Sequence, residues 1–236
     1  MNRKSKLAAA FFCGAVVVLA AMGIGRVVQV EMGSVHSRRQ RPTIILDPGH
    51  GGVDGGAQAN GVSEKEVNLA ISLQLRDLLS AQGFRVIMTR EDDRSIHDEG
   101  ITQISRQKRS ALYNRLAIIE DHPEAIFVSI HQNKFEQASS RGAQIFFSPN
   151  NPESQKLAQS IQETFVSLLQ PENTRQIKKA ENNLFLLYEA QIPAVMAECG
   201  FLSNPEEEGL LQDPKYQQTL AAAIAAGCLG GSSDLP

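Results

Sequence analysis

The 236-residue chain has only three cysteines, too few for the disulfide scaffold of a small secreted protein. Cys13 lies in an apolar N-terminal stretch, but Ala10-Phe11-Phe12 before it does not offer the small residue that lipoprotein processing needs. Cys199 and Cys228 would be able to pair in an oxidising compartment, yet nothing in the sequence fixes the distance between them. We therefore expect two small buried residues with free thiols.

Long basic runs, internal repeats and low-complexity tracts are also absent. The net charge is -3, with 23 lysines and arginines against 26 acidic residues, whereas nucleic-acid binding depends on clustered positive charge. The chain is 42% hydrophobic and 21% charged, which is typical of one globular domain of roughly 200 residues. This composition excludes a disordered chain and predicts no nucleic-acid partner.

The N-terminus differs in composition from the rest of the chain. A basic flank at residues 2–6 precedes an uncharged, mostly apolar stretch from Leu7 to Gly25, close to the ~20 residues that span a bilayer. Basic residues stay on the cytoplasmic side, so the following chain is expected to be translocated. We predict a signal-anchor at residues 1–25, a linker at 26–42, a catalytic domain at 43–230 and a short tail at 231–236. Cleavage near Ala21-Met22-Gly23 would release a secreted form instead of a membrane-anchored one.

Strand-like and helix-like segments alternate along the remaining chain, which predicts an α/β fold. Helices are expected after Ser63 as far as Gly83, along the stripe of Leu112, Leu116 and Ile119, after Asn151-Pro152 to Leu168, and after Asn204-Pro205 and Asp213-Pro214. Residues 91–108 and 170–183 have no clear period and are expected to be loops. Strands are expected in the run at residues 43–50 and at residues 84–89, 126–131, 143–147, 184–188 and 194–197.

Three apolar, strand-like segments end on a metal-binding or acidic residue. In α/β sheets, ligands gather outside the carboxyl ends of parallel strands, so such residues are expected to converge. The segments are Thr43 to His50 (TIILDPGH), Ile126 to His131 (IFVSIH) and Ala194 to Glu198 (AVMAE). Glu64 completes a set of two histidines and two glutamates. We assign Glu66 to a capping box with Ser63, which leaves Glu64 as the acid that faces the glycine-rich loop.

Taken singly, each of these residues also has a structural interpretation. A histidine after an apolar strand is more often a hydrogen-bonded structural residue, and the glycines after His50 fit a phosphate-binding turn equally well. No GxGxxG motif or Walker lysine follows them, however. Taken together, His50, Glu64 and His131 fit a catalytic zinc site with three protein ligands, and Glu198 fits a general base. His97 and His122 are interpreted as surface residues.

Four sequence blocks resemble the zinc-dependent N-acetylmuramoyl-L-alanine amidases of type 3. They are LDPGHGG at Leu46 to Gly52, SEKEVNL at Ser63 to Leu69, SIHQN at Ser129 to Asn133, and ECGFLSNPEE at Glu198 to Glu207. The resemblance implies a mainly parallel twisted sheet flanked by helices. It also implies hydrolysis of the amide bond between N-acetylmuramic acid and L-alanine in peptidoglycan, with His50, Glu64 and His131 as zinc ligands and Glu198 as the catalytic residue. Asn133 and Arg115 are further candidates for supporting the substrate or the site.

Within this family, the chain most resembles the germination-specific amidases of spore-forming bacteria. The features in common are one amidase domain behind a membrane segment, TREDD at Thr89 to Asp93, a loop with Ser105-Arg106, and the helix of Arg115. The resemblance implies preparation of the spore cortex for muramic δ-lactam, functional partnership with a muramic acid deacetylase, a lipoprotein activator, and a place between the spore membranes. The alternatives are a general cell-wall amidase of growth or division, a zinc peptidase or deacetylase, and a non-catalytic peptidoglycan-binding regulator.

Overall fold

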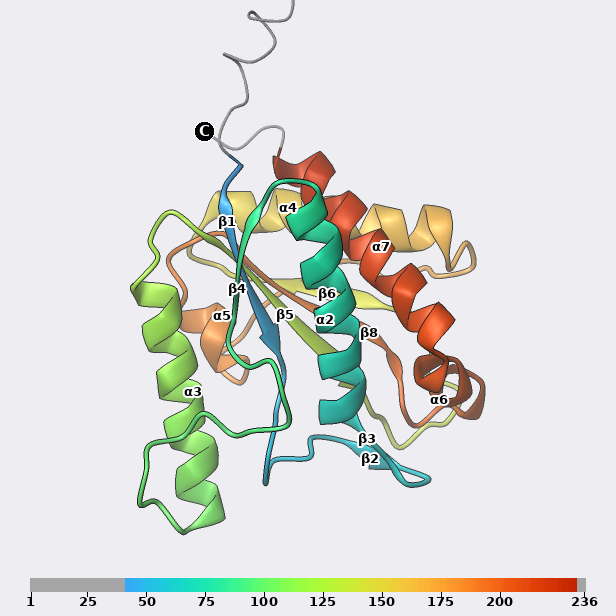
Figure 1. Ribbon diagram of the computed structural model, residues 1–236. Coiled ribbons are helices and arrows are strands. Elements are labelled where there is room, and N and C mark those ends of the chain that lie inside the picture. The colour runs from blue at the N-terminus through green and yellow to red at the C-terminus, as the bar shows by residue number, and fades with distance from the viewer. Residues whose placement is uncertain (1–40, 233–236) are drawn as a thin grey trace, which may run out of the picture. The chain divides into compact units, whose positions relative to one another are not determined.

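A six-stranded sheet forms the centre of the part of the chain that the computed structural model describes, residues 41–232 (Figure 1). The predicted signal-anchor, most of the linker and the last residues of the tail lie outside these residues. Among residues 41–232, no helix is both long enough and apolar enough to cross a bilayer.

The sheet is mainly parallel, as expected from the family resemblance. Its strand order is β4-β1-β5-β8-β6-β7, and all neighbours run parallel except β6 and β8, which are antiparallel. A short antiparallel hairpin of β2 (Gln58–Ala59) and β3 (Val62–Ser63) follows the glycine-rich loop. The six strands are β1 (Thr43–Pro48), β4 (Arg85–Met88), β5 (Ile126–Asn133), β6 (Gln144–Phe147), β7 (Lys178–Lys179) and β8 (Ala194–Phe201).

Helices cover both faces of this sheet. One face packs against α2 (Glu64–Ala81), α4 (Pro152–Leu168) and α7 (Pro214–Ser232), with α6 (Pro205–Gln212) leading into α7. The other face packs against α3 (Ile104–Glu120) and α5 (Phe185–Glu189) (Figure 1). Along the three central strands β1, β5 and β8, side chains alternate between the two apolar cores, so these strands are almost entirely buried. The edge strands β4 and β7 are more exposed.

The capping signals place two helix starts correctly. The side chain of Asn151 accepts a hydrogen bond from Glu153 N at the start of α4, and that of Asn204 accepts from two backbone N–H groups at the start of α6. The spacing of Leu157, Ile161, Phe165 and Leu168 predicts the buried stripe of α4. The first three are buried, whereas Leu168 is 62% exposed.

The start of α3 and its buried face differ from the prediction. The helix begins at Ile104 rather than after Lys108, and its first two turns are polar and exposed, which hides their helical period in the sequence. Its buried residues are Ala111, Arg115 and Ile119, whereas Leu112 is 38% exposed. An arginine therefore occupies the stripe where the sequence suggested leucine.

The predicted strand at residues 184–188 is wrong, because this segment contains the short helix α5. In an apolar segment of only five residues, hydrophobic periodicity cannot distinguish a strand from a buried turn of helix. Here Leu186 and Leu187 are both buried in the core beneath α3 and α5.

Cys199 and Cys228 are buried with free thiols, as predicted.

Candidate metal centre

His50 lies in a tight turn just beyond the end of β1. Its backbone φ is 64°, and the next two glycines also have positive φ values, so the chain reverses sharply there. The ring is held on both sides. Its Nδ1 lies 2.8 Å from Asp54 Oδ2, and its Nε2 lies 3.2 Å from Glu64 Oε2.

Glu64 is the first residue of α2 and is only 3% exposed. Its Oε2 accepts a hydrogen bond from Ala57 N (2.8 Å), and its Oε1 accepts from Gln132 N (3.1 Å) and from the amide of Asn68 (3.2 Å). These donors fix the carboxylate between the glycine-rich loop and β5. The acid therefore points into the site, as predicted.

The capping box that led to this assignment is absent. Ser63 makes no side-chain cap to α2, and its hydroxyl donates instead to Gly55 O at 2.8 Å. Glu66 is exposed. Glu64 is selected over Glu66 by the direction of the helix start, which turns the first position toward β5 and the third toward solvent.

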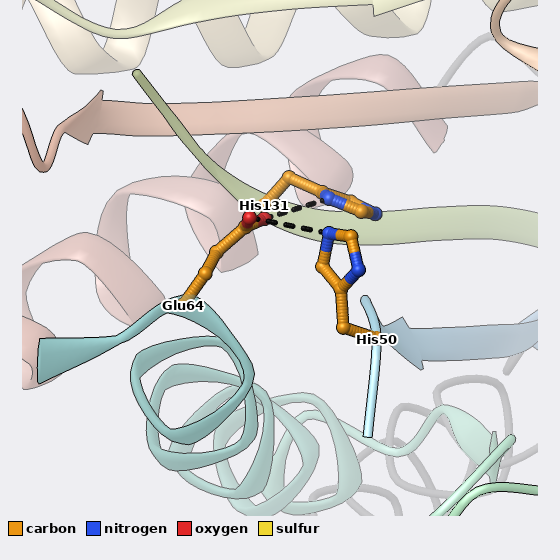
Figure 2. A group of neighbouring side chains, drawn as sticks. All are labelled: His50, Glu64 and His131. Carbon is orange, nitrogen blue, oxygen red and sulfur yellow. Dashed lines mark hydrogen bonds and ion pairs between the residues drawn. The ribbon is translucent and has the colours of Figure 1, made fainter. Parts of the chain in front are cut away.

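His131 completes a cluster of three metal-binding side chains. Its Nδ1 lies 2.9 Å from Glu64 Oε1, and its ring meets the His50 ring edge to face with centroids 4.9 Å apart. Figure 2 shows both imidazoles directed at the single carboxylate between them. One ligand atom from each of the three residues lies within 4.8 Å of the others, so the residues fit a metal ion bound by two nitrogens and a carboxylate.

The cluster has strongly perturbed ionisation. Burial lowers the pKa of His50, but its hydrogen bonds with Asp54 and Glu64 outweigh burial and raise the pKa to about 9. Burial opposes ionisation of Glu64, yet hydrogen bonds with His131 and His50 bring the pKa of this carboxyl well below its usual range. Because a ligating histidine must be neutral, a metal ion would bind here with release of a proton.

Glu198 lies beside this cluster on β8. It is the Cα partner of His131 in the parallel β5–β8 ladder, so both side chains leave the same face of the sheet. Both strands run further than predicted, to Asn133 and Phe201, so the two residues lie within the strand ends instead of beyond them. Glu198 Oε2 is buried and has no hydrogen-bond partner, and burial raises the pKa of its carboxyl to about 7. A buried carboxylate oxygen without a partner, next to converging ligands, is typical of a functional site.

The two candidate support residues have different surroundings. The guanidinium of Arg115 is buried and donates to Asp47 Oδ1 (2.7 Å) and to His50 O (2.6 Å). Asn133 is partly exposed, and its side-chain oxygen accepts a hydrogen bond from Lys134 N. Arg115 thus supports the backbone that carries His50, whereas Asn133 lies two residues past His131.

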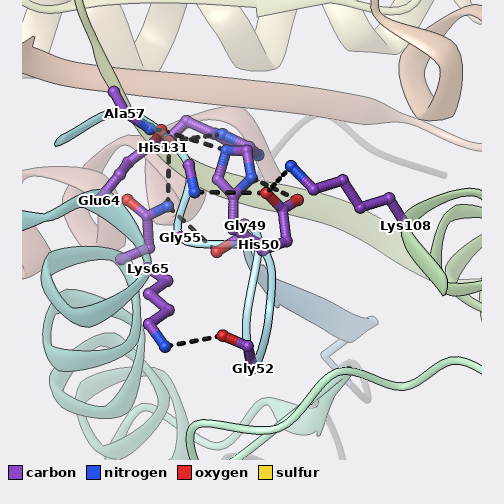
Figure 3. Close-up of polar contacts among 12 residues, drawn as sticks. Gly49, His50, Gly52, Gly55, Ala57, Glu64, Lys65, Lys108 and His131 are labelled. Atoms are coloured by element: carbon purple, nitrogen blue, oxygen red, sulfur yellow. Dashed lines mark hydrogen bonds and ion pairs between the residues drawn. The ribbon is translucent and has the colours of Figure 1, made fainter. Parts of the chain in front are cut away.

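The sequence interpretation missed Asp54 and Lys108. Asp54 orients His50, and Lys108 of α3 forms an ion pair of 2.7 Å with the other oxygen of Asp54. Figure 3 shows Lys108 reaching from α3 toward the loop of His50. The four-residue spacing of His50 and Asp54 within a glycine-rich loop is the only local signal for this pair, and Lys108 has none because it comes from another element.

Replacement of Arg115 by methionine is expected to lower the free energy of unfolding at pH 7 by about 3–5 kcal/mol, because Asp47 would be left as a buried charge without its cation. In the folded wild type, burial opposes ionisation of Asp47, but Arg115, Thr89 and Ser129 lower its pKa. The stabilisation is therefore present above the unfolded pKa of about 3.9 and is lost as the pH falls through the folded pKa. Urea unfolding at several pH values tests this expectation.

The matched control for this experiment is Arg106→Met, on an exposed position of the same helix. We expect this change to alter stability by less than about 0.5 kcal/mol. Two results would contradict a buried ion pair as the cause. One is an equal loss of unfolding free energy in the two variants, and the other is a difference in unfolding free energy between Arg115→Met and wild type that does not become smaller at acid pH.

Comparison with known proteins identifies the family. A family model described as N-acetylmuramoyl-L-alanine amidase matches residues 44–229. The germination-specific N-acetylmuramoyl-L-alanine amidase of Bacillus subtilis is 40% identical over 186 residues, which cover 79% of this chain and 78% of the relative.

Solved structures agree with this assignment. The CwlD amidase of Clostridioides difficile, solved in complex with the GerS lipoprotein, is 42% identical and superposes with a TM-score of 0.78 over 81% of this chain and 98% of that one. An N-acetylmuramoyl-L-alanine amidase of Clostridium difficile 630 is 30% identical, with a TM-score of 0.70 over 84% of this chain and 100% of that one. Together with the clustered His50, Glu64 and His131, these similarities show that the chain belongs to the N-acetylmuramoyl-L-alanine amidase family and is a peptidoglycan hydrolase of that class.

Proposed function

We propose that this amidase is zinc-dependent, with His50, Glu64 and His131 as the protein ligands and Glu198 as the general base. The observation that carries the proposal is the convergence of the three ligand atoms within 4.8 Å, with Glu198 on the neighbouring strand. Two histidines and one glutamate are a known ligand set of catalytic zinc sites, which keep a further position for water or substrate.

A bound Zn²⁺ would polarise the scissile carbonyl and make the attacking water more acidic. Glu198 accepts the proton of that water at its unpartnered Oε2 and returns it to the nitrogen of L-alanine as the amide bond breaks. Asp54 fixes the orientation of the His50 ring through Nδ1, which leaves Nε2 directed at the metal position. Arg115 holds the backbone carbonyl of His50 and so keeps the turn in place.

We further propose that the chain acts on spore cortex and prepares it for muramic δ-lactam formation, in functional partnership with a muramic acid deacetylase. Identities of 40% and 42% with the germination-specific amidase and with CwlD support this role, whereas the AmiA amidase of Escherichia coli is 27% identical. Since that CwlD structure contains a lipoprotein, a lipoprotein activator is proposed for this chain as well. A general cell-wall amidase remains the alternative.

The proposed site of action is outside the cytoplasm, where peptidoglycan lies. The family assignment supports this compartment. The anchor at residues 1–25, and with it a place between the two membranes of the developing spore, is proposed from the sequence alone.

Digestion of peptide-bearing glycan by the full-length chain, followed by mass spectrometry, tests the proposed activity. The expected products are glycan strands without stem peptides and stem peptides with new L-alanine amino termini, together with about one zinc per chain by elemental analysis. A peptidase would cut within the stem, a deacetylase would release acetate, and a regulator would bind the glycan without cutting it. Any of these three results would refute the proposed reaction.

A further inference from the structure

A row of side chains crosses the sheet at the edge that carries the metal centre. Glu198 is the Cα partner of His131 on one side and of Gln144 on the other. Directly opposite residues in a ladder project from the same face, so these three side chains share the face covered further along by α3 and α5. Met196 and Phe146, two positions away along the same strands, belong to the apolar core of that face and confirm its direction.

Arg175 continues this row toward β7. One of its terminal nitrogens, Nη1, lies 3.4 Å from Gln144 Oε1, and its Nε donates to Arg141 O at 2.7 Å. The guanidinium carbon lies 4.6 Å from the centroid of the buried Phe201 ring. Stacking and two directed hydrogen bonds hold the side chain in one position, although the residue is partly exposed.

Arg175 forms no ion pair among residues 41–232, whereas two other cations near the site do. Lys65 pairs with Asp93, and Lys108 pairs with Asp54. The nearby Glu207 is engaged elsewhere, because its two oxygens accept hydrogen bonds from Gly142 N (2.9 Å) and Phe201 N (2.8 Å).

Arg175 is also partly exposed to solvent. The residue lines an open pocket of about 660 Å³, together with Gly142, Asn173 and Tyr216. The Arg175 guanidinium is thus held beside Gln144. Burial raises the pKa of the nearby Glu207 carboxyl, and the charge of Arg175, which forms no ion pair with it, helps to lower that pKa. A fixed planar fork of this kind is suited to binding a carboxylate.

We propose that Arg175 binds the free α-carboxylate of the second stem-peptide residue. This contact would place the peptide side of the scissile amide over β6 and the glycan side away from it. This inference rests on the proposed role of Glu198. In peptidoglycan the second residue is a glutamate joined through its side chain, so its α-carboxylate is free. Arg175 lies about two strand spacings from Glu198, roughly 10 Å. Neighbouring Cα atoms in an extended chain lie about 3.8 Å apart. The α-carboxylate one residue past the scissile bond therefore spans the gap of roughly 10 Å when two contacts are added, that of the amide with Glu198 and that of the carboxylate with Arg175.

Lys134 is the competing cation at this edge. Its ammonium donates to Gln58 O at 2.7 Å, so it is directed at the β2–β3 hairpin, away from the row formed by Glu198 and Gln144. It is also exposed and has a flexible stem, whereas Arg175 presents a fixed planar fork. These differences favour Arg175 as the carboxylate site.

The test uses two glycan strands whose stem peptides differ only at the second residue, which carries either a free α-carboxylate or the corresponding carboxamide. Wild-type chain is expected to cleave the acidic strand with a kcat/KM about 10- to 100-fold higher than that of the amidated strand. Arg175→Ala should lose this preference and cleave the amidated strand at the wild-type rate. Arg175→Lys should recover part of the preference, since it restores the charge without the fork.

Lys178→Ala is the matched control, because it removes an exposed positive charge from β7 nearby. It should keep the full preference. The inference is overturned if Arg175→Ala slows both strands equally, if it keeps the wild-type preference, or if Lys134→Ala removes the preference instead. Wild-type chain that cleaves both strands equally well would overturn this inference alone. Wild-type chain that cleaves neither would overturn the proposed function as well.

Discussion

Glu198→Gln is expected to lower kcat for release of stem peptides by about 10²–10⁴-fold while zinc content stays at the wild-type level. The amide keeps the size of the carboxylate but cannot accept the proton of the attacking water. Glu198 is not a member of the cluster of His50, Glu64 and His131, so its replacement is expected to leave the proposed ligands in place. Glu198→Ala should give the same pattern. Single-turnover digestion and elemental analysis of the same preparation provide the two measurements.

Glu66→Gln is the matched control for this change. Glu66 is an exposed acid in the first turn of α2, two residues from Glu64, and its replacement should leave both turnover and zinc unchanged. Retained turnover in the Glu198 variant would refute the assigned base. Loss of zinc from that variant would show instead that Glu198 acts as a ligand.

The positions of the two histidines are predictable because each follows a strong local signal. His50 and His131 come at or near the ends of apolar strand-forming runs, and parallel strands bring their carboxyl ends to one edge. Glu64 lies in the cluster with them as expected, although the capping box used to choose it does not form. The Glu64 carboxylate is held by hydrogen bonds from Ala57 N and Gln132 N. These donors belong to other segments, so the sequence around Glu64 does not predict them.

The residues that were missed owe their positions to contacts between distant elements. Gln144 lies beside Glu198 only because β6 pairs antiparallel with β8, and a single-sequence pattern does not report pairing order. Arg175 lies in a segment without periodicity, for which the sequence predicts only a loop. The errors at α3 and α5 have a related cause, because burial there is decided by packing against the sheet and not by the period of each segment.

His131→Ala is expected to remove both zinc and activity, in contrast to the Glu198 variants. Loss of one of three protein ligands should weaken zinc binding by more than the roughly 10–100-fold that replacement of a supporting residue causes. The fold should persist, because Glu64 keeps its hydrogen bonds from Ala57 N and Gln132 N when the imidazole is gone. Zinc content, digestion of peptide-bearing glycan and thermal unfolding of the full-length chain measure the three effects separately.

His122→Ala is the control that separates ligand loss from loss of any histidine. The His122 ring contacts Ile118 O at the end of α3 and takes no part in the cluster of His50, Glu64 and His131, so zinc and activity should both be retained. A His131 variant with wild-type zinc but no turnover would assign His131 to catalysis and not to the metal. A variant that keeps both would exclude it from the site. Only joint loss of zinc and activity in a folded chain agrees with a ligand, and combined with the Glu198 result it assigns metal binding and proton transfer to different residues of one strand pair.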